Sequence, residues 1–150
     1  MGFNLLLMEE LGYTVLKRDA NGQRLPEVDW SKTRAVANRE LNIYLNLKGR
    51  QAEGIVEPAD KYELEEQIIT DLYGYRHPQS GKRVIALALR NKDAVLLGLG
   101  GPMGADIVIF VHDDYVEDHG NGLSTACGYK GTSVSPTFII AGEGIKPGYT

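Results

Sequence analysis

The sequence has a single cysteine, Cys127, and no apolar run that is long enough to cross a bilayer. One cysteine excludes an internal disulfide and any metal motif built from two cysteines, and it is typical of a reducing compartment. The N-terminal segment has neither a basic region nor a small-residue cleavage site, so we expect no signal peptide. We therefore expect a cytoplasmic protein that does not bind membranes.

The chain also lacks an excess of charge of either sign. It has 16 Lys and Arg residues against 20 Asp and Glu residues, a formal net charge of -4, and neither sign forms a run. Binding to a nucleic-acid duplex relies on clustered cations, so we expect no duplex partner. The 150 residues, of which 43% are hydrophobic, are instead sufficient for one domain with a core of its own.

Alternating apolar residues mark the strands that the sequence predicts. Residues 41–47 alternate leucine or isoleucine with asparagine or tyrosine, the pattern of a strand that is buried on one face. Residues 84–89 and 138–140 predict two more strands. Residues 107–111 are apolar throughout, as in the central strand of a mixed or parallel sheet. Residues 25–29 are interpreted as a loop.

Helical spacing of apolar residues predicts a helix over residues 60–73, which we expect to cover the sheet that contains the strand at 107–111 as an internal strand. Asp60 and Glu63 stand at capping-box spacing at its start. A shorter helix is predicted near the N-terminus, with Asn4 as its cap. The expected fold class is α/β, a mixed sheet with flanking helices, in a single domain over residues 1–150.

A cationic turn follows the strand at 41–47. Its residues are Lys48, Gly49 and Arg50, and glycine permits a sharp change of direction between two cations that have no reason to be buried. One interpretation is a solvated turn. The other is an anion-binding site formed by Lys48 and Arg50 together with Lys130.

Two histidines and four carboxylates lie within residues 112–119, directly after an apolar strand. Imidazole and carboxylate groups suit zinc, manganese or magnesium. The alternative is a polar surface loop, which we favour because metal ligands must converge in space and the spacing of one loop does not guarantee this. The candidate metal ligands are His112, Asp113, Asp118 and His119.

Four glycines within residues 98–104 invite comparison with a phosphate-binding loop. Such a loop needs a helix N-terminus after its glycines, so that backbone N–H groups point at the phosphate. An apolar strand is predicted there instead, and this context argues against nucleotide binding.

Six segments follow one another in a recognisable order: NLLLMEELGY, DWSKTRA, IYLNLKGR, GIVEP, ADIVIF and SPTFIIAGEGIKPG. Together they cover most of the chain. In this order they resemble the C-terminal part of type I phosphodiesterase/nucleotide pyrophosphatase-like proteins of the alkaline phosphatase superfamily. The resemblance implies a partial alkaline-phosphatase-like fold.

The resemblance also implies a chemistry that this chain does not contain by itself. Such enzymes hydrolyse phosphate esters with two metal ions, zinc or manganese in a parent of this kind, which activate a threonine or serine nucleophile. The nucleophile and most of the ligands lie in the N-terminal half of the family. The sequence Asp118-His119-Gly120 is similar to a metal motif of the family but lies too late in the chain, and we interpret it as a coincidence.

Two hypotheses follow from the resemblance. The chain is the C-terminal fragment of a larger hydrolase, inactive and without metals by itself, or it is a degenerate relative that keeps the scaffold. The competing class is a non-catalytic domain that binds anions or other proteins. A severed sheet or helix face would be left bare, so we expect a homo-oligomer.

Overall fold

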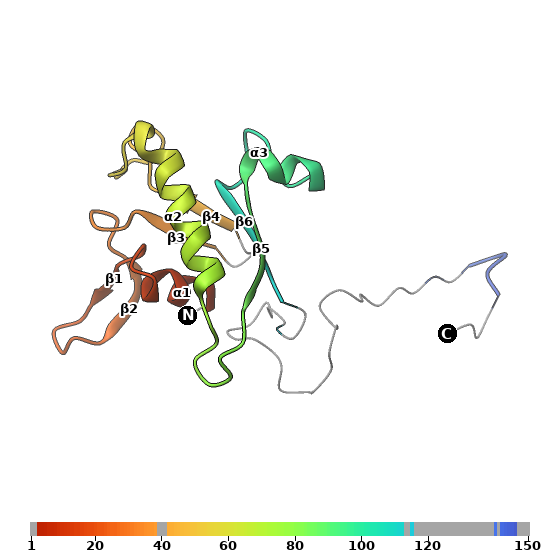
Figure 1. Ribbon diagram of the computed structural model, residues 1–150, viewed down its shortest axis with the longest axis horizontal. Coiled ribbons are helices and arrows are strands. Elements are labelled where there is room, and N and C mark those ends of the chain that lie inside the picture. The colour runs from red at the N-terminus through yellow and green to blue at the C-terminus, as the bar shows by residue number, and fades with distance from the viewer. Residues whose placement is uncertain (1–2, 39–41, 113–114, 116–139, 141, 147–150) are drawn as a thin grey trace.

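The computed structural model describes residues 3–38, 42–112, 115, 140 and 142–146 of the chain (Figure 1). The helices are α1 (Phe3–Glu10), α2 (Lys61–Gly74) and α3 (Asn91–Ala94), with 3₁₀ turns η1 (Pro58–Asp60) and η2 (Val95–Leu97). The strands are β1 (Leu16–Arg18), β2 (Arg24–Val28), β3 (Ala35–Ala37), β4 (Asn42–Leu45), β5 (Ile85–Arg90) and β6 (Ile107–Val111).

The main sheet has four strands in the order β3-β4-β6-β5, and a separate pair joins β1 to β2. The strand at 107–111 is internal, as predicted. Every ladder between the named strands is antiparallel, so the expected mixed sheet is wrong for the described residues. An apolar run reports that a strand is buried but carries no information about its direction, which explains the error. The fold is a mixture of α and β structure with two small antiparallel sheets.

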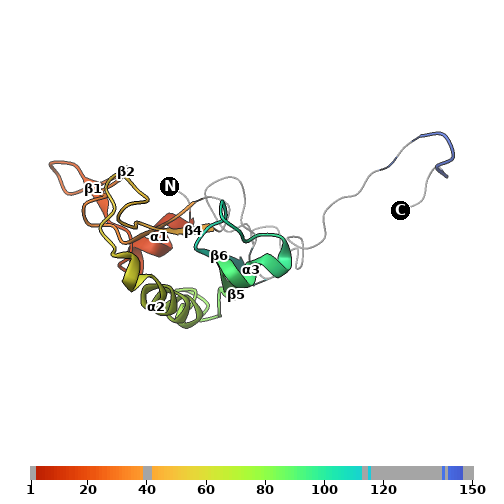
Figure 2. The ribbon, with the colours of Figure 1, turned by 90° about the horizontal axis from the view of Figure 1, so that it is seen from above.

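Helices α1 and α2 supply the apolar side chains that cover one face of the main sheet. Leu7 and Met8 of α1 and Ile68 of α2 belong to the same buried cluster as Ile43 and Ile107 of the sheet. The predicted helix at 60–73 is therefore confirmed, and it packs on the sheet that contains the strand at 107–111, as predicted. The β1–β2 pair and α3 lie on opposite sides of α2 in both views (Figures 1 and 2).

A smaller cluster occupies the other face of the sheet. Ala94, Ala105 and Val108 are buried there, and Tyr44 and Phe110 are among the partly buried side chains that pack against them. Among the described residues, no helix combines the length and the apolar composition that crossing a membrane requires.

Three local expectations differ from the structure. Residues 24–28 form β2 rather than a loop, although Pro26 lies within it. Helix α1 already includes Asn4, which is therefore not its cap. Asp60 makes no side-chain cap, because η1 precedes α2 and Asp60 has helical φ and ψ of -87° and 0°, whereas a capping residue is extended. Of the predicted strand at 138–140, positions 138 and 139 lie outside the described residues.

Both edge strands of the main sheet have side-chain or loop partners. On β5, the Tyr73 hydroxyl accepts a hydrogen bond from the Ala88 N–H at 3.0 Å. On β3, the Ala35 carbonyl accepts from the Thr14 hydroxyl at 2.6 Å, and the Ala35 N–H donates to the Tyr13 carbonyl at 3.2 Å. These bonds satisfy outer backbone groups that would otherwise be open to a strand of another chain.

Candidate functional site

A buried carboxylate, Asp106, lies just before β6 and joins three parts of the fold. Its side chain is 3% exposed. The Arg50 guanidinium donates to both oxygens, from Nη1 to Oδ1 at 2.8 Å and from Nη2 to Oδ2 at 2.5 Å. The Leu45 N–H donates to Oδ2 at 2.7 Å, and Lys61 Nζ lies 3.0 Å from Oδ1. A bidentate arginine and two further donors leave this carboxylate well satisfied.

A second buried carboxylate, Glu65 of α2, extends this arrangement. Lys61 Nζ lies 3.5 Å from Oε1 of Glu65, and Arg90 Nε lies 3.4 Å from its Oε2. Arg90 also contacts Glu66 at the surface. The Arg90 Nε has no hydrogen-bond acceptor within the described residues, so its contact with Glu65 is an ion pair without hydrogen-bond geometry. We call the set Arg50, Lys61, Glu65, Arg90 and Asp106 the charge network.

The two carboxylates of the charge network have pKa values that shift in opposite directions. Burial alone would raise the pKa of Asp106, but hydrogen bonds from Arg50, the Leu45 backbone and Lys61 hold it below its ordinary value. Burial raises the pKa of Glu65, and the charges of Lys61 and Arg90 offset this only in part. Asp106 is therefore a fixed anion at neutral pH and is poorly suited to accept a proton.

Asn46 is the residue around which residues 30–58 fold. Its side chain is buried, and Nδ2 lies within 3.0 Å of the carbonyl oxygens of Trp30, Thr33 and Glu53. The backbone carbonyl of Asn46 accepts hydrogen bonds from the backbone N–H groups of Ile55 and Val56 at 2.9 and 3.0 Å. The sequence places Asn46 on the polar side of an alternating strand, so its burial was missed. No pattern signal distinguishes a buried amide from an exposed one.

The cationic turn is present, but its cations have partners within the protein. Gly49 adopts a left-handed φ of 78°, as a sharp turn requires. Lys48 pairs with Glu57, and the guanidinium of Arg50 binds Asp106. An external anion at this turn would compete with both carboxylates. Lys130, the third predicted contact, lies outside the described residues.

Gly54 allows the return of this turn to pack closely. A Cβ atom at Gly54 would lie 2.1 Å from the carbonyl oxygen of Leu47, which is far inside van der Waals contact. Leu47 and Val56 form a bridge just beyond. The segments around Arg50 and Val56 are thereby held against one another.

Of the predicted metal ligands, only His112 lies within the described residues; Asp113, Asp118 and His119 do not. His112 follows β6, and its backbone N–H donates to the Val84 carbonyl at 2.7 Å. It lines an open cavity of about 490 Å³ together with Lys82, Arg83 and Ala86. Structural zinc has four ligands and catalytic zinc at least three from protein. In the part of the chain that the structure describes, no three His, Cys, Asp or Glu side chains could hold a metal ion together.

The glycine-rich segment at 98–104 folds around a side chain. The Asn91 amide donates to the carbonyls of Gly101 and Ala105 at 3.0 and 2.7 Å, and it accepts from the Gly101 N–H at 3.1 Å. The strand β6 follows, as predicted, in place of the helix that a phosphate-binding loop needs.

Comparison of the chain with protein-family models, curated proteins and solved structures finds no match in any of the three. Function is thus inferred from the contacts, burial and charges of the described residues.

Proposed function

We propose that this chain is the C-terminal portion of a metal-dependent phosphodiesterase-like hydrolase, in which it serves as a scaffold and is inactive by itself. The resemblance of the six segments motivates the proposal. The observation that supports a scaffold role is that one segment, IYLNLKGR, forms ion pairs with two of the others. Arg50 belongs to IYLNLKGR, Asp106 belongs to ADIVIF, and Glu57, which pairs with Lys48, belongs to GIVEP.

The charged residues of these segments are occupied by internal pairs. A catalytic carboxylate must reach its substrate and have a pKa near the working pH. Asp106 is buried and its pKa is lowered, so its role is to hold the turn at 48–57 and α2 against the sheet. In this proposal the nucleophile and the zinc or manganese ions belong to the remainder of the parent, which acts on a phosphate ester.

A hydrolysis assay tests the proposal. The purified chain is incubated with bis(p-nitrophenyl) phosphate alone, with zinc and with manganese, and release of p-nitrophenol is followed. We expect no turnover above that of a control with substrate and metal but without protein. Two-metal catalysis needs a nucleophile and paired ligands, which the resemblance places in the N-terminal half of the family. Metal-dependent turnover that disappears in a His112→Ala, His119→Ala variant would refute the proposal and identify the 112–119 loop as the active site.

A second candidate, a protein-interaction domain, is favoured by an exposed apolar surface. The segment that follows β5 and α3 leaves large apolar side chains in water, including Leu96 at 90% and Met103 at 95% exposed. No ionisable residue occurs between Ala94 and Ala105. Several exposed large apolar side chains within one short segment are typical of interaction sites. We call it the apolar hairpin; its exposed residues are Val95, Leu96, Leu97, Leu99 and Met103.

The occupant that we propose for the apolar hairpin is a second copy of the chain. A two-fold interface brings each surface against itself, so any charge on it meets a like charge. The apolar hairpin has none, and self-contact there buries apolar area without burying an unpaired ion. The same self-contact fits both a scaffold portion that lacks its parent and a self-contained interaction domain.

A further inference from the structure

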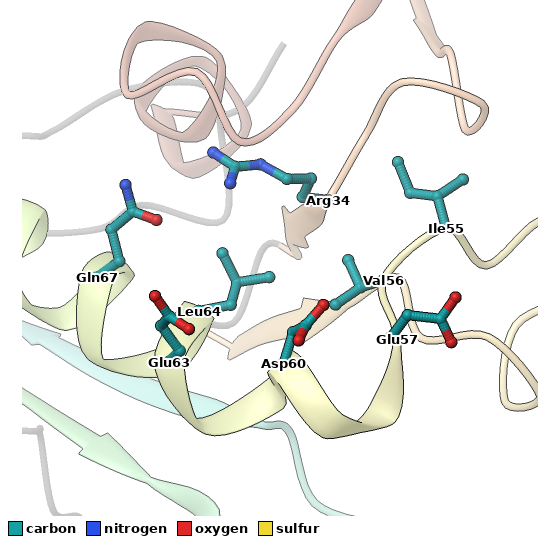
Figure 3. Close-up of a pocket in the computed structure, with 8 residues that line it drawn as sticks. All are labelled: Arg34, Ile55, Val56, Glu57, Asp60, Glu63, Leu64 and Gln67. Atoms are coloured by element: carbon teal, nitrogen blue, oxygen red, sulfur yellow. The ribbon is translucent and has the colours of Figure 1, made fainter.

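A cavity of about 340 Å³ lies between the start of α2, residues 55–57 and Arg34, which directly precedes β3 (Figure 3). This volume is within the range of small-molecule sites, about 300 to 1,000 Å³. Its apolar lining comes from Ile55, Val56 and Leu64. Its polar lining differs from one side to the other; the residues are Arg34, Glu57, Asp60, Glu63 and Gln67.

Two exposed carboxylates, Asp60 and Glu63, lie on the helical side of the cavity. Asp60 and Glu63 stand at capping-box spacing, yet Asp60 makes no side-chain cap. Within the described residues, no hydrogen bond or ion pair reaches either carboxylate. Acidic residues in a first turn also interact favourably with the helix dipole, but this requires no cavity in front of them. Glu57 differs from both because it pairs with Lys48.

Arg34 provides positive charge across the cavity from these carboxylates (Figure 3). Its guanidinium lies 5.1 Å from the centroid of the Tyr13 ring, which holds it by a cation–π contact. No carboxylate within the described residues pairs with it. Gln67 extends from α2 towards it and adds an amide to this side (Figure 3).

We propose that the cavity binds a small linear zwitterion, an aliphatic amine with a carboxylate at its other end. The ammonium group pairs with Asp60 and Glu63, the carboxylate pairs with Arg34, and the methylene stem lies on Leu64 and Val56. Both ends of such a ligand find opposite charge, whereas a simple amine leaves Arg34 unpaired and a simple carboxylate leaves Asp60 and Glu63 unpaired. The inference does not depend on the hydrolase proposal.

The test is an NMR titration of the whole chain with 5-aminopentanoate, and with pentylamine and pentanoate as its two half-ligands at equal ionic strength. The expected result is saturable shifts of amides at residues 55–67. Each half-ligand should bind about threefold to fivefold more weakly, the factor that a partly exposed ion pair contributes to an equilibrium constant.

Matched variants assign the two ends. In an Asp60→Asn, Glu63→Gln variant, 5-aminopentanoate should bind no better than pentanoate; in Arg34→Gln it should bind no better than pentylamine. Asp93→Asn, an exposed carboxylate on α3, is the control and should leave all affinities unchanged. Absence of saturable shifts at residues 55–67, or equal binding of all three probes, overturns the inference. No hydrogen bond or ion pair within the described residues reaches the carboxylates of Asp60 and Glu63. The Asp60→Asn, Glu63→Gln variant should therefore fold, and it tests the site even if Arg34→Gln does not fold.

Discussion

At the scale of single residues, Asp106 is the buried charge that links separate parts of the fold. One carboxylate accepts from the Arg50 side chain and the Leu45 backbone and contacts Lys61, so it links the turn at 48–57, β4 and α2. Removing one partner of a buried pair leaves the other charge without compensation, and this costs more than the pair itself contributes. The carboxylate is therefore a position where substitution should strongly destabilise the fold.

Asp106→Ala should lower the free energy of unfolding by an amount near the lower end of the roughly 3–5 kcal/mol range for broken buried pairs, because Arg50 is partly exposed. Urea denaturation measures this. The matched control is Asp93→Ala, an exposed carboxylate that should change stability by less than about 0.5 kcal/mol. Equal stabilities of the two variants would show that the network does not hold the fold.

The two buried carboxylates should give opposite dependences of stability on pH. Asp106 has a lowered pKa in the folded state, so its contribution is present above its unfolded pKa of about 3.9 and is lost as pH falls through the folded pKa. Glu65 has a raised pKa, so its contribution is present below its unfolded pKa of about 4.3 and is lost as pH rises through the folded pKa.

Unfolding free energies between about pH 3 and about pH 7 test both signs. Relative to Asp106→Asn, the wild-type protein should lose stability on acidification. Relative to Glu65→Gln, it should lose stability as the pH rises. Two differences that change in the same direction with pH would contradict the assignment.

At the scale of elements, the edge of β5 is closed by a side chain of the helix that covers the sheet. Tyr73 of α2 accepts from the Ala88 N–H, and its hydroxyl lies 3.4 Å from the Ala88 carbonyl. One hydroxyl therefore occupies both outward backbone groups of that residue. This edge is not open to strand addition there, which directs association towards side chains instead.

Tyr73→Phe should expose this edge without removing the ring from the core. The Ala88 N–H loses its acceptor, at an expected loss of about 1–2 kcal/mol in stability, and its hydrogen exchange should accelerate. Exchange measured by NMR at Ala88 checks this. Tyr62→Phe, an exposed tyrosine on the same helix, is the control and should leave the rate unchanged. Unchanged exchange at Ala88 in Tyr73→Phe would mean that the hydroxyl does not protect the edge.

At the scale of the whole molecule, the apolar hairpin is the surface that the fold leaves least covered. It follows α3, on the other side of α2 from the β1–β2 pair (Figures 1 and 2). Its exposed side chains lie outside both buried clusters, so they contribute little to folding. A change of these side chains should therefore affect association more than stability.

Light scattering over a wide range of dilution should show the wild-type chain as a dimer or larger assembly that dissociates on dilution. A Leu96→Gln, Met103→Gln variant should be monomeric throughout and equally stable. Tyr62→Ser, which removes another exposed apolar side chain, should associate as the wild type does. A monomeric wild type, or an assembly that survives the double change, would contradict the proposed self-contact.

The periodic patterns of the sequence were sufficient for the central elements. The strands β4, β5 and β6, the helix α2 and its packing on the sheet were all predicted, because the period of apolar residues reports which face of an element is buried. The strand direction was predicted wrongly, as a mixed sheet. The short strands β2 and β3 were missed, since three to five residues carry little periodic signal.

The candidate sites depended on tertiary structure. The sequence identified Arg50 as a cation in a glycine turn, but Asp106 lies 56 positions away and only folding brings the two together. Asn46 and Asp60 likewise have roles that local spacing misassigned, one buried among carbonyl groups and the other facing a cavity instead of capping a helix. Local periodicity determines which residues leave water, because hydrophobic burial follows the face of each element; which charges meet there is determined by the packing of distant segments.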